Sequence, residues 1–151
     1  MISNCNIIHY PNPYTNILYY TSYIYFFNAI YGLSNHIYDL ASYTGLVWLT
    51  SINYWSNPTI KYNYYLDIIT VRSGIIYHLS RALDASNYFY FYIIFITGLL
   101  FYIPARYFCS KEQYFISTIF HANMHIITGI ALFYLYSNKI KPLSKPDLNN
   151  L

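Results

Sequence analysis

The sequence predicts an all-α fold, a polytopic transmembrane helical bundle of about five spans. Charged residues make up 9% of the chain, against roughly 25% in an ordinary soluble domain. Hydrophobic residues make up 56%, and they gather in long uncharged runs separated by short polar or proline-containing links. The 22 tyrosines agree with this class, since a tyrosine ring can lie in the apolar layer with its hydroxyl at the layer's edge.

Five apolar stretches have lengths suited to crossing a hydrocarbon core of ~30 Å at ~1.5 Å per helical residue. They cover residues 17–38, 40–55, 65–83, 88–103 and 114–136. Together they define one transmembrane helical domain over 17–136. A polar segment, 1–16, precedes this domain and a flexible polar tail, 137–151, follows it.

The first two spans follow from prolines, small side chains and an aromatic end. Pro11 and Pro13 prevent a regular helix within residues 1–16, so we expect the first span to begin after them. Segment 40–55 is rich in small side chains, which allow a neighbouring helix to approach closely. It ends at Trp55, which is typical of a membrane–water interface.

Segment 65–83 is the most polar of the five. It carries Asp67, Arg72, His78 and Arg81, and helical spacing places all of these except Arg72 on one face. An amphipathic helix lying on a membrane surface has a similar pattern. We favour a spanning helix buried against others, because both neighbouring segments are strongly apolar.

The fourth stretch and the chain's end are simpler. Segment 88–103 is apolar on every face, which predicts a lipid-facing span that ends at Pro104. The tail from 137 onward contains Pro142 and Pro146, and its composition predicts no regular structure.

A polar stripe runs along the last segment, 114–136, which has no charged residue. His121 and His125 lie one helical turn apart, and Thr118 and Thr128 extend the same line. Imidazole groups at this depth are costly against lipid, so they usually face the interior of a bundle. We therefore expect this stripe to be buried against the other spans.

Five spans bring distant polar residues to one half of the membrane. The loops after the second and fourth spans lie on the same side, and Ser51, Trp55 and Asp67 are near that side. His121 and His125 enter from it, at depths of roughly 10 and 16 Å at ~1.5 Å per residue. We predict that these side chains converge inside the bundle.

His78 and Arg81 should lie near the opposite surface. Asp67 and His78 are separated by eleven helical residues, a rise of about 16 Å. The His78 ring should therefore not bond to either histidine of the last segment. We expect Arg81 to extend its guanidinium toward the water there.

These residues resemble a known pattern. Ser51-x-x-x-Trp55, then Asp67, then His121-x-x-x-His125 is similar to the motifs of the alkaline ceramidases and their relatives, the CREST superfamily. The resemblance implies a membrane hydrolase of seven helices, with zinc on three histidines. It also implies that the serine and aspartate hold the water and stabilise the oxyanion. The chain departs from the pattern, since Trp55 stands where the family has a third histidine and there is room for about five spans.

A zinc site would be built from few donors. His121 and His125 supply half of a tetrahedral site, and the third protein ligand of a catalytic site could only be Asp67. The chain therefore holds either no cofactor or zinc. Each residue also has a structural interpretation. Buried histidines often bond to hydroxyl groups, and Asp67 can cap the start of its helix. Ser51 can be a packing residue, and Trp55 can be an anchor at the membrane interface.

Three function classes follow. The first is a small integral membrane protein, a non-catalytic or degenerate relative of CREST hydrolases. The second is a zinc-dependent hydrolase that cleaves an amide or ester bond in a membrane lipid, with Ser51 and Asp67 as catalytic residues. The third is a packing subunit of a larger membrane complex. We favour the first, which has the lipid bilayer as its partner.

Other partners and the compartment are less defined. The net charge of +3 comes without a basic run, so nothing indicates nucleic-acid binding. The two cysteines, Cys5 and Cys109, have no metal-binding or redox spacing. The sequence does not identify which membrane holds the protein.

Overall fold

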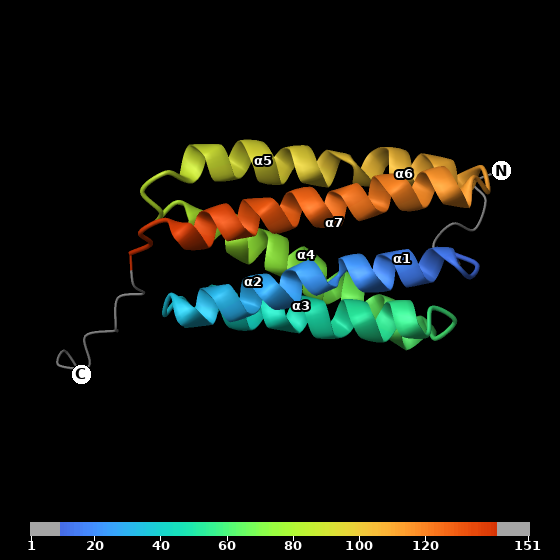
Figure 1. Cartoon of the computed structure of the whole chain (residues 1–151), viewed down its shortest axis with the longest axis horizontal. Helices are drawn as coiled ribbons and strands as arrows, with labels where there is room; N and C mark the ends of the chain where they lie inside the picture. The colour runs from blue at the N-terminus through green and yellow to red at the C-terminus, as the bar shows by residue number, and fades with distance from the viewer. Residues whose placement is uncertain (1–9, 142–151) are drawn as a thin grey trace.

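The helices lie side by side, roughly parallel to the long axis of the molecule (Figure 1). The computed structural model describes residues 10–141, so Cys5 and the predicted tail from 142 onward lie outside it. The helices are α1 (Tyr14–Thr21), α2 (Tyr23–Ser34), α3 (Tyr38–Ser56), α4 (Lys61–Ala82), α5 (Tyr88–Leu100), α6 (Tyr102–Ser110) and α7 (Tyr114–Ser137). These residues contain no named strand, so the predicted all-α class is confirmed.

Seven helices make only five rods because two of the junctions are a single residue long. Ser22 separates α1 from α2 and has helical backbone angles, and Phe101 separates α5 from α6 in the same way. The rods therefore follow the five predicted apolar stretches. Two of them, Tyr88–Ser110 and Tyr114–Ser137, are long and apolar enough by composition to cross a membrane.

Helix α7 occupies the centre of the bundle. It packs against α5 and α6 on one side and against α1 and α2 on the other, while α3 packs against α2 and α4. Figure 1 shows α5 and α6 along one edge and α1, α2 and α3 along the other, while α4 crosses at the back from the end of α3 to the start of α5. The start of α1 and the end of α7 lie at opposite ends of the bundle.

The prolines do not stop helices where we expected. Helix α1 begins at Tyr14, immediately after Pro13, rather than at residue 17. The fourth rod continues beyond Pro104 to Ser110. Both prolines lie at the beginning of a helix, where a missing backbone N–H breaks no hydrogen bond.

The ends of the described chain also join the fold. Tyr10 is 3% exposed and packs in the core, although we predicted residues 1–16 as a polar segment outside the bundle. After α7, Ile140 forms an isolated antiparallel bridge with Ala85 in the α4–α5 connection. Residues 10–16 and 137–141 thus contribute contacts that the composition did not reveal.

Candidate functional site

The predicted site residues line one cavity in the bundle. The cavity has a volume of about 320 Å³ and lies between α3, α4, α5 and α7. Ser51, Trp55, Asp67, His121 and His125 all contribute to its wall. All five predicted residues thus line the same cavity, although the side-chain hydrogen bonds of Asp67 are to Thr50 and Ser51 and not to a histidine.

Ser51 and Asp67 form a hydrogen-bonded pair across α3 and α4. The Ser51 hydroxyl donates to Asp67 Oδ1 at 2.7 Å, and the Thr50 hydroxyl donates to the same oxygen at 3.2 Å. The second carboxylate oxygen, Oδ2, has no hydrogen bond or ion pair within residues 10–141. Because α4 begins at Lys61, Asp67 lies well inside the helix and does not cap it.

The two histidines lie on the buried face of α7. Their ring centroids are 5.0 Å apart, and both side chains are less than 10% exposed. Nδ1 of His125 bonds to the Thr21 hydroxyl at 3.0 Å. Nδ1 of His121 is buried and has no hydrogen-bond partner in the part of the chain that the structure describes.

The rest of the predicted stripe on α7 is buried as well. Thr128 bonds to the Tyr25 hydroxyl at 2.9 Å, whereas the Thr118 hydroxyl has no partner among the described residues. The stripe therefore faces other helices, as the cost of polar groups against lipid predicts.

Trp55 fills the space beside His121. The two ring centroids are 5.3 Å apart and nearly perpendicular, and Trp55 also packs against Tyr10. Trp55 is only 4% exposed, so the interpretation of this residue as an interface anchor is wrong. Tyr10 packs in the same hydrophobic cluster as Trp55 and so helps to bury it.

The donors present do not fit a three-ligand zinc centre. Within residues 10–141 no three histidine, cysteine or carboxylate side chains come close enough together to hold a metal ion. Asp67 is held by Ser51 and Thr50, and the neighbour of His121 is the indole of Trp55, which offers no metal ligand. The predicted set of His121, His125 and Asp67 is not assembled in this conformation.

No protein-family model, curated protein or solved structure matches this chain. The likeness to CREST hydrolases therefore depends on four side chains, those of Ser51, Asp67, His121 and His125. Their placement at one cavity is a property of this structure and does not depend on that likeness.

A second buried polar cluster surrounds His78. Its Nδ1 donates to the Gly74 carbonyl at 2.7 Å, so Nε2 is the accepting nitrogen. It lies within hydrogen-bond distance of the Tyr136 hydroxyl, at 2.9 Å, and the Thr44 hydroxyl, at 3.1 Å. Tyr136 lies fifteen residues after His121 on α7, about 22 Å along the helix. Among the described residues His78 bonds to Gly74, Thr44 and Tyr136 and not to His121 or His125, in agreement with our prediction.

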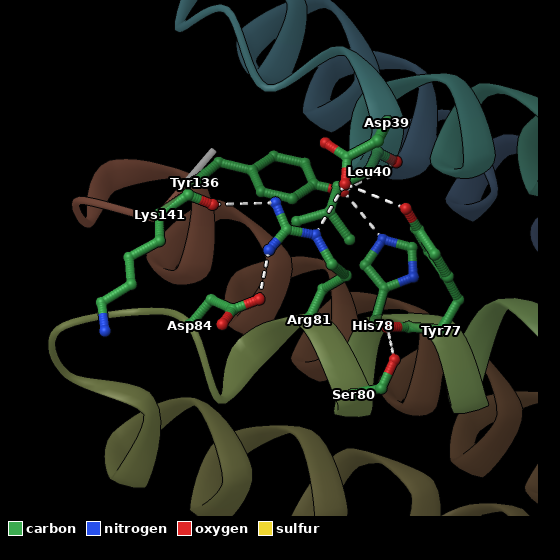
Figure 2. A network of polar contacts seen from close by, with 9 residues as sticks. All are labelled: Asp39, Leu40, Tyr77, His78, Ser80, Arg81, Asp84, Tyr136 and Lys141. Carbon is green, nitrogen blue, oxygen red and sulfur yellow. Dashed lines mark hydrogen bonds and ion pairs between the residues drawn. The ribbon is translucent and has the colours of Figure 1, made fainter. Parts of the chain in front are cut away.

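Arg81 is the centre of a third cluster, shown in Figure 2. Its Nε donates to Asp39 Oδ2 at 2.7 Å, a guanidinium nitrogen pairs with Asp84, and another donates to the Lys141 carbonyl at 3.2 Å. Tyr77 adds a hydrogen bond to Asp39 at 2.9 Å. Arg81 is 7% exposed, so our expectation that it extends into water is wrong.

The sequence contained a signal for one of these missed clusters. Asp39 begins one helix of an antiparallel pair and Arg81 ends the other, so their opposite charges had to lie at the same end of the bundle. The partners of His78 had no comparable signal, because Thr44 and Tyr136 are typical of any apolar helix in this tyrosine-rich chain.

Proposed function

We propose that this chain is a five-span integral membrane protein that binds an apolar molecule in its central cavity and lacks zinc-dependent hydrolytic activity. The outer surface supports the membrane assignment. Each rod exposes large apolar side chains, for example Ile30 at 51%, Leu49 at 53%, Ile69 at 65%, Ile93 at 49% and Ile130 at 50%. Exposed large apolar side chains on every rod are expected of a surface that faces lipid, whereas large apolar patches are rare on soluble monomers.

The distribution of charge supports the same assignment. Most charged residues of the described chain lie at a rod end or within about one helical turn of it. They are Asp39, Lys61, Arg81, Asp84, Arg106, Lys111, Glu112, Lys139 and Lys141. Asp67 and Arg72 are the exceptions, and both line the cavity. An apolar band therefore lies between two charged ends.

The rods also have the required length. The shortest, α3, has 19 residues and the longest, α7, has 24, which correspond to about 28 and 36 Å. A hydrocarbon core is ~30 Å thick. A single membrane layer thus accommodates all five rods.

The cavity is the observation that carries the binding function. Most of its wall is aliphatic or aromatic, and Ser51, Asp67, His121 and His125 are among its few polar groups. A mostly apolar cavity with a small number of placed polar groups is the usual form of a small-molecule site. Its position inside the bundle favours a molecule that reaches it from the bilayer.

We further propose that the chain is a degenerate relative of CREST hydrolases. The Ser51–Asp67 pair and the two histidines agree with that origin, and Trp55 in place of a metal ligand agrees with loss of zinc. Without a third donor, the two imidazoles lack the ligand set of a catalytic zinc site.

Labelling of introduced cysteines should place the two ends of the bundle on opposite sides of the membrane. We expect Gln113→Cys and Asn138→Cys, made in a chain whose natural cysteines are replaced by serine, to react with an impermeant maleimide from opposite sides of sealed vesicles. Five crossings require this because one crossing, α7, separates the two positions. Labelling of both from the same side would contradict the five-span topology.

Metal analysis should separate the degenerate relative from the active hydrolase. We expect no stoichiometric zinc in the purified wild type and about one zinc per chain in Trp55→His, because this substitution restores a third imidazole beside His121. The double variant Trp55→His/His121→Ala should lose it. Stoichiometric zinc in the wild type that disappears in His121→Ala would instead favour the hydrolase.

Native mass spectrometry of the detergent-solubilised protein tests the cavity directly. We expect bound apolar molecules on the wild type and their loss in Val71→Phe, which places a larger ring in the cavity wall. Ile69→Phe is the matched control, since Ile69 is on the same helix but 65% exposed. Equal occupancy in both variants would contradict binding in the cavity, and a stably bound second protein would favour the packing-subunit alternative.

A further inference from the structure

The charges and rings of the cavity define the class of its ligand. We infer that it takes a lipophilic amine, an apolar chain or ring system with a protonated amino group, and that Asp67 receives the ammonium. This inference rests on the proposed binding function and adds the chemistry of the ligand.

The Asp67 carboxylate has no compensating cation among the described residues. Asp67 lies six residues after the start of α4, and its Oδ1 is held by two neutral hydroxyls. The ion pairs among residues 10–141 all involve Arg81 at the far end of α4, so no cation of the described chain neutralises Asp67. A carboxylate in an apolar bundle is stabilised by a positive charge, and the cavity leaves room for a ligand to supply one.

Aromatic side chains form part of the cavity wall. Tyr54, Trp55, Tyr64 and Tyr102 line the same cavity as Asp67. The faces of aromatic rings attract ammonium groups, with Trp the strongest, and the attraction grows when the cation is shielded from water. A neutral or anionic head group would not gain this stabilisation.

The His121 imidazole has a ring nitrogen without a hydrogen-bond partner among the described residues. His121 lines the cavity, is 7% exposed and has no hydrogen-bond partner for Nδ1 among the described residues. An unpaired buried nitrogen is costly, and an ammonium has more than one N–H to donate. A primary amine can therefore interact with the carboxylate and still offer donors to neighbouring groups.

Arg72 is the competing charge, because it also lines the cavity and would favour an anion. It lies five residues after Asp67, about 140° further around α4, and it is exposed. No ion pair joins the two side chains in the described range. The more enclosed charge is thus the negative one, and an acid with the same tail tests this directly.

The experiment uses Trp55 as the reporter. The chain has two tryptophans, and Trp48 does not line the cavity, so Trp48→Phe leaves a single indole at the site. The full chain in nanodiscs of uncharged lipid is titrated with decylamine, decanol and decanoic acid, while Trp55 fluorescence is recorded. We expect decylamine to bind at least about tenfold more tightly than either of the others, a difference of ~1.4 kcal/mol.

Matched variants assign the preference to Asp67. Asp67→Asn should reduce decylamine affinity to that of decanol, and Asp67→Glu should retain the preference. Asp84→Asn removes a carboxylate at the far end of α4 and should leave all three affinities unchanged. An amine preference that survives in Asp67→Asn would overturn the inference.

The three ligands also distinguish a failure of the amine assignment from a failure of the proposed binding function. If decanol or decanoic acid binds as tightly as decylamine, and Val71→Phe weakens them all, the cavity binds apolar molecules but the assignment of an amine is wrong. If none of the three changes Trp55 fluorescence in any protein, the binding function is wrong as well.

Discussion

Replacing Arg81 with methionine is expected to lower the free energy of unfolding by about 3 kcal/mol, near the lower end for removing one partner of a buried ion pair. The Arg81 side chain is 8% exposed and that of Asp39 is 21% exposed. Methionine has a similar length but leaves the Asp39 carboxylate and the Lys141 carbonyl without this partner. Titration with SDS in mixed micelles measures the change.

The matched control for Arg81→Met is Asp84→Asn. Asp84 also pairs with Arg81, but its side chain is 45% exposed, so its loss should cost less than about 1 kcal/mol. An equal decrease in the free energy of unfolding in the two variants would show that the Asp39–Arg81 contact does not stabilise this end of the bundle.

The pH dependence of the same contact has a defined sign. Burial disfavours the charged form of Asp39, but the hydrogen bonds from Arg81 and Tyr77 outweigh it and lower the pKa of Asp39 from its ordinary value of 3.8. A lowered pKa contributes stability above the unfolded-state value, and this contribution disappears as the pH falls through the folded-state value. The difference between wild type and Arg81→Met should therefore narrow in acid, below about pH 4.

Replacing Gly98 with alanine is expected to destabilise the protein by about 2 kcal/mol, within the range for overpacking. A Cβ at Gly98 would lie 2.7 Å from Thr128 Cγ2 and 2.9 Å from the Thr128 backbone nitrogen. Because part of the obstacle is backbone, a change of rotamer cannot relieve it, and α5 must move away from α7. The thermal unfolding midpoint in detergent reports the loss.

Gly45→Ala is the control for Gly98→Ala. The nearest atom to a Cβ at Gly45 is 3.7 Å away, and alanine is the better helix former by about 1 kcal/mol. We expect an unchanged or raised midpoint for Gly45→Ala. A similar fall in both variants would mean that loss of glycine itself, and not the α5–α7 contact, causes the effect.

The sequence by itself determined the number of helical rods and the position of each polar residue along the length of its rod. Apolar runs separated by polar links gave five rods, and the rise of ~1.5 Å per residue placed Ser51, Asp67, His121 and His125 at similar heights. That was sufficient to predict their convergence. Opposite charges at the paired ends of α3 and α4 would have revealed the Asp39–Arg81 contact by the same reasoning.

Tertiary structure decided what each of these side chains touches. Burial of Trp55 depends on Tyr10, which the composition placed in a polar segment. The separation of Asp67 from the two histidines depends on how α3, α4 and α7 are rotated and spaced, and the same holds for the bonds of His78 to Thr44 and Tyr136. Helical periodicity fixes the position of a residue along its own helix and the direction in which its side chain leaves the axis of that helix. The rotation and spacing of neighbouring helices come from side-chain packing between segments distant in sequence, which no local pattern specifies.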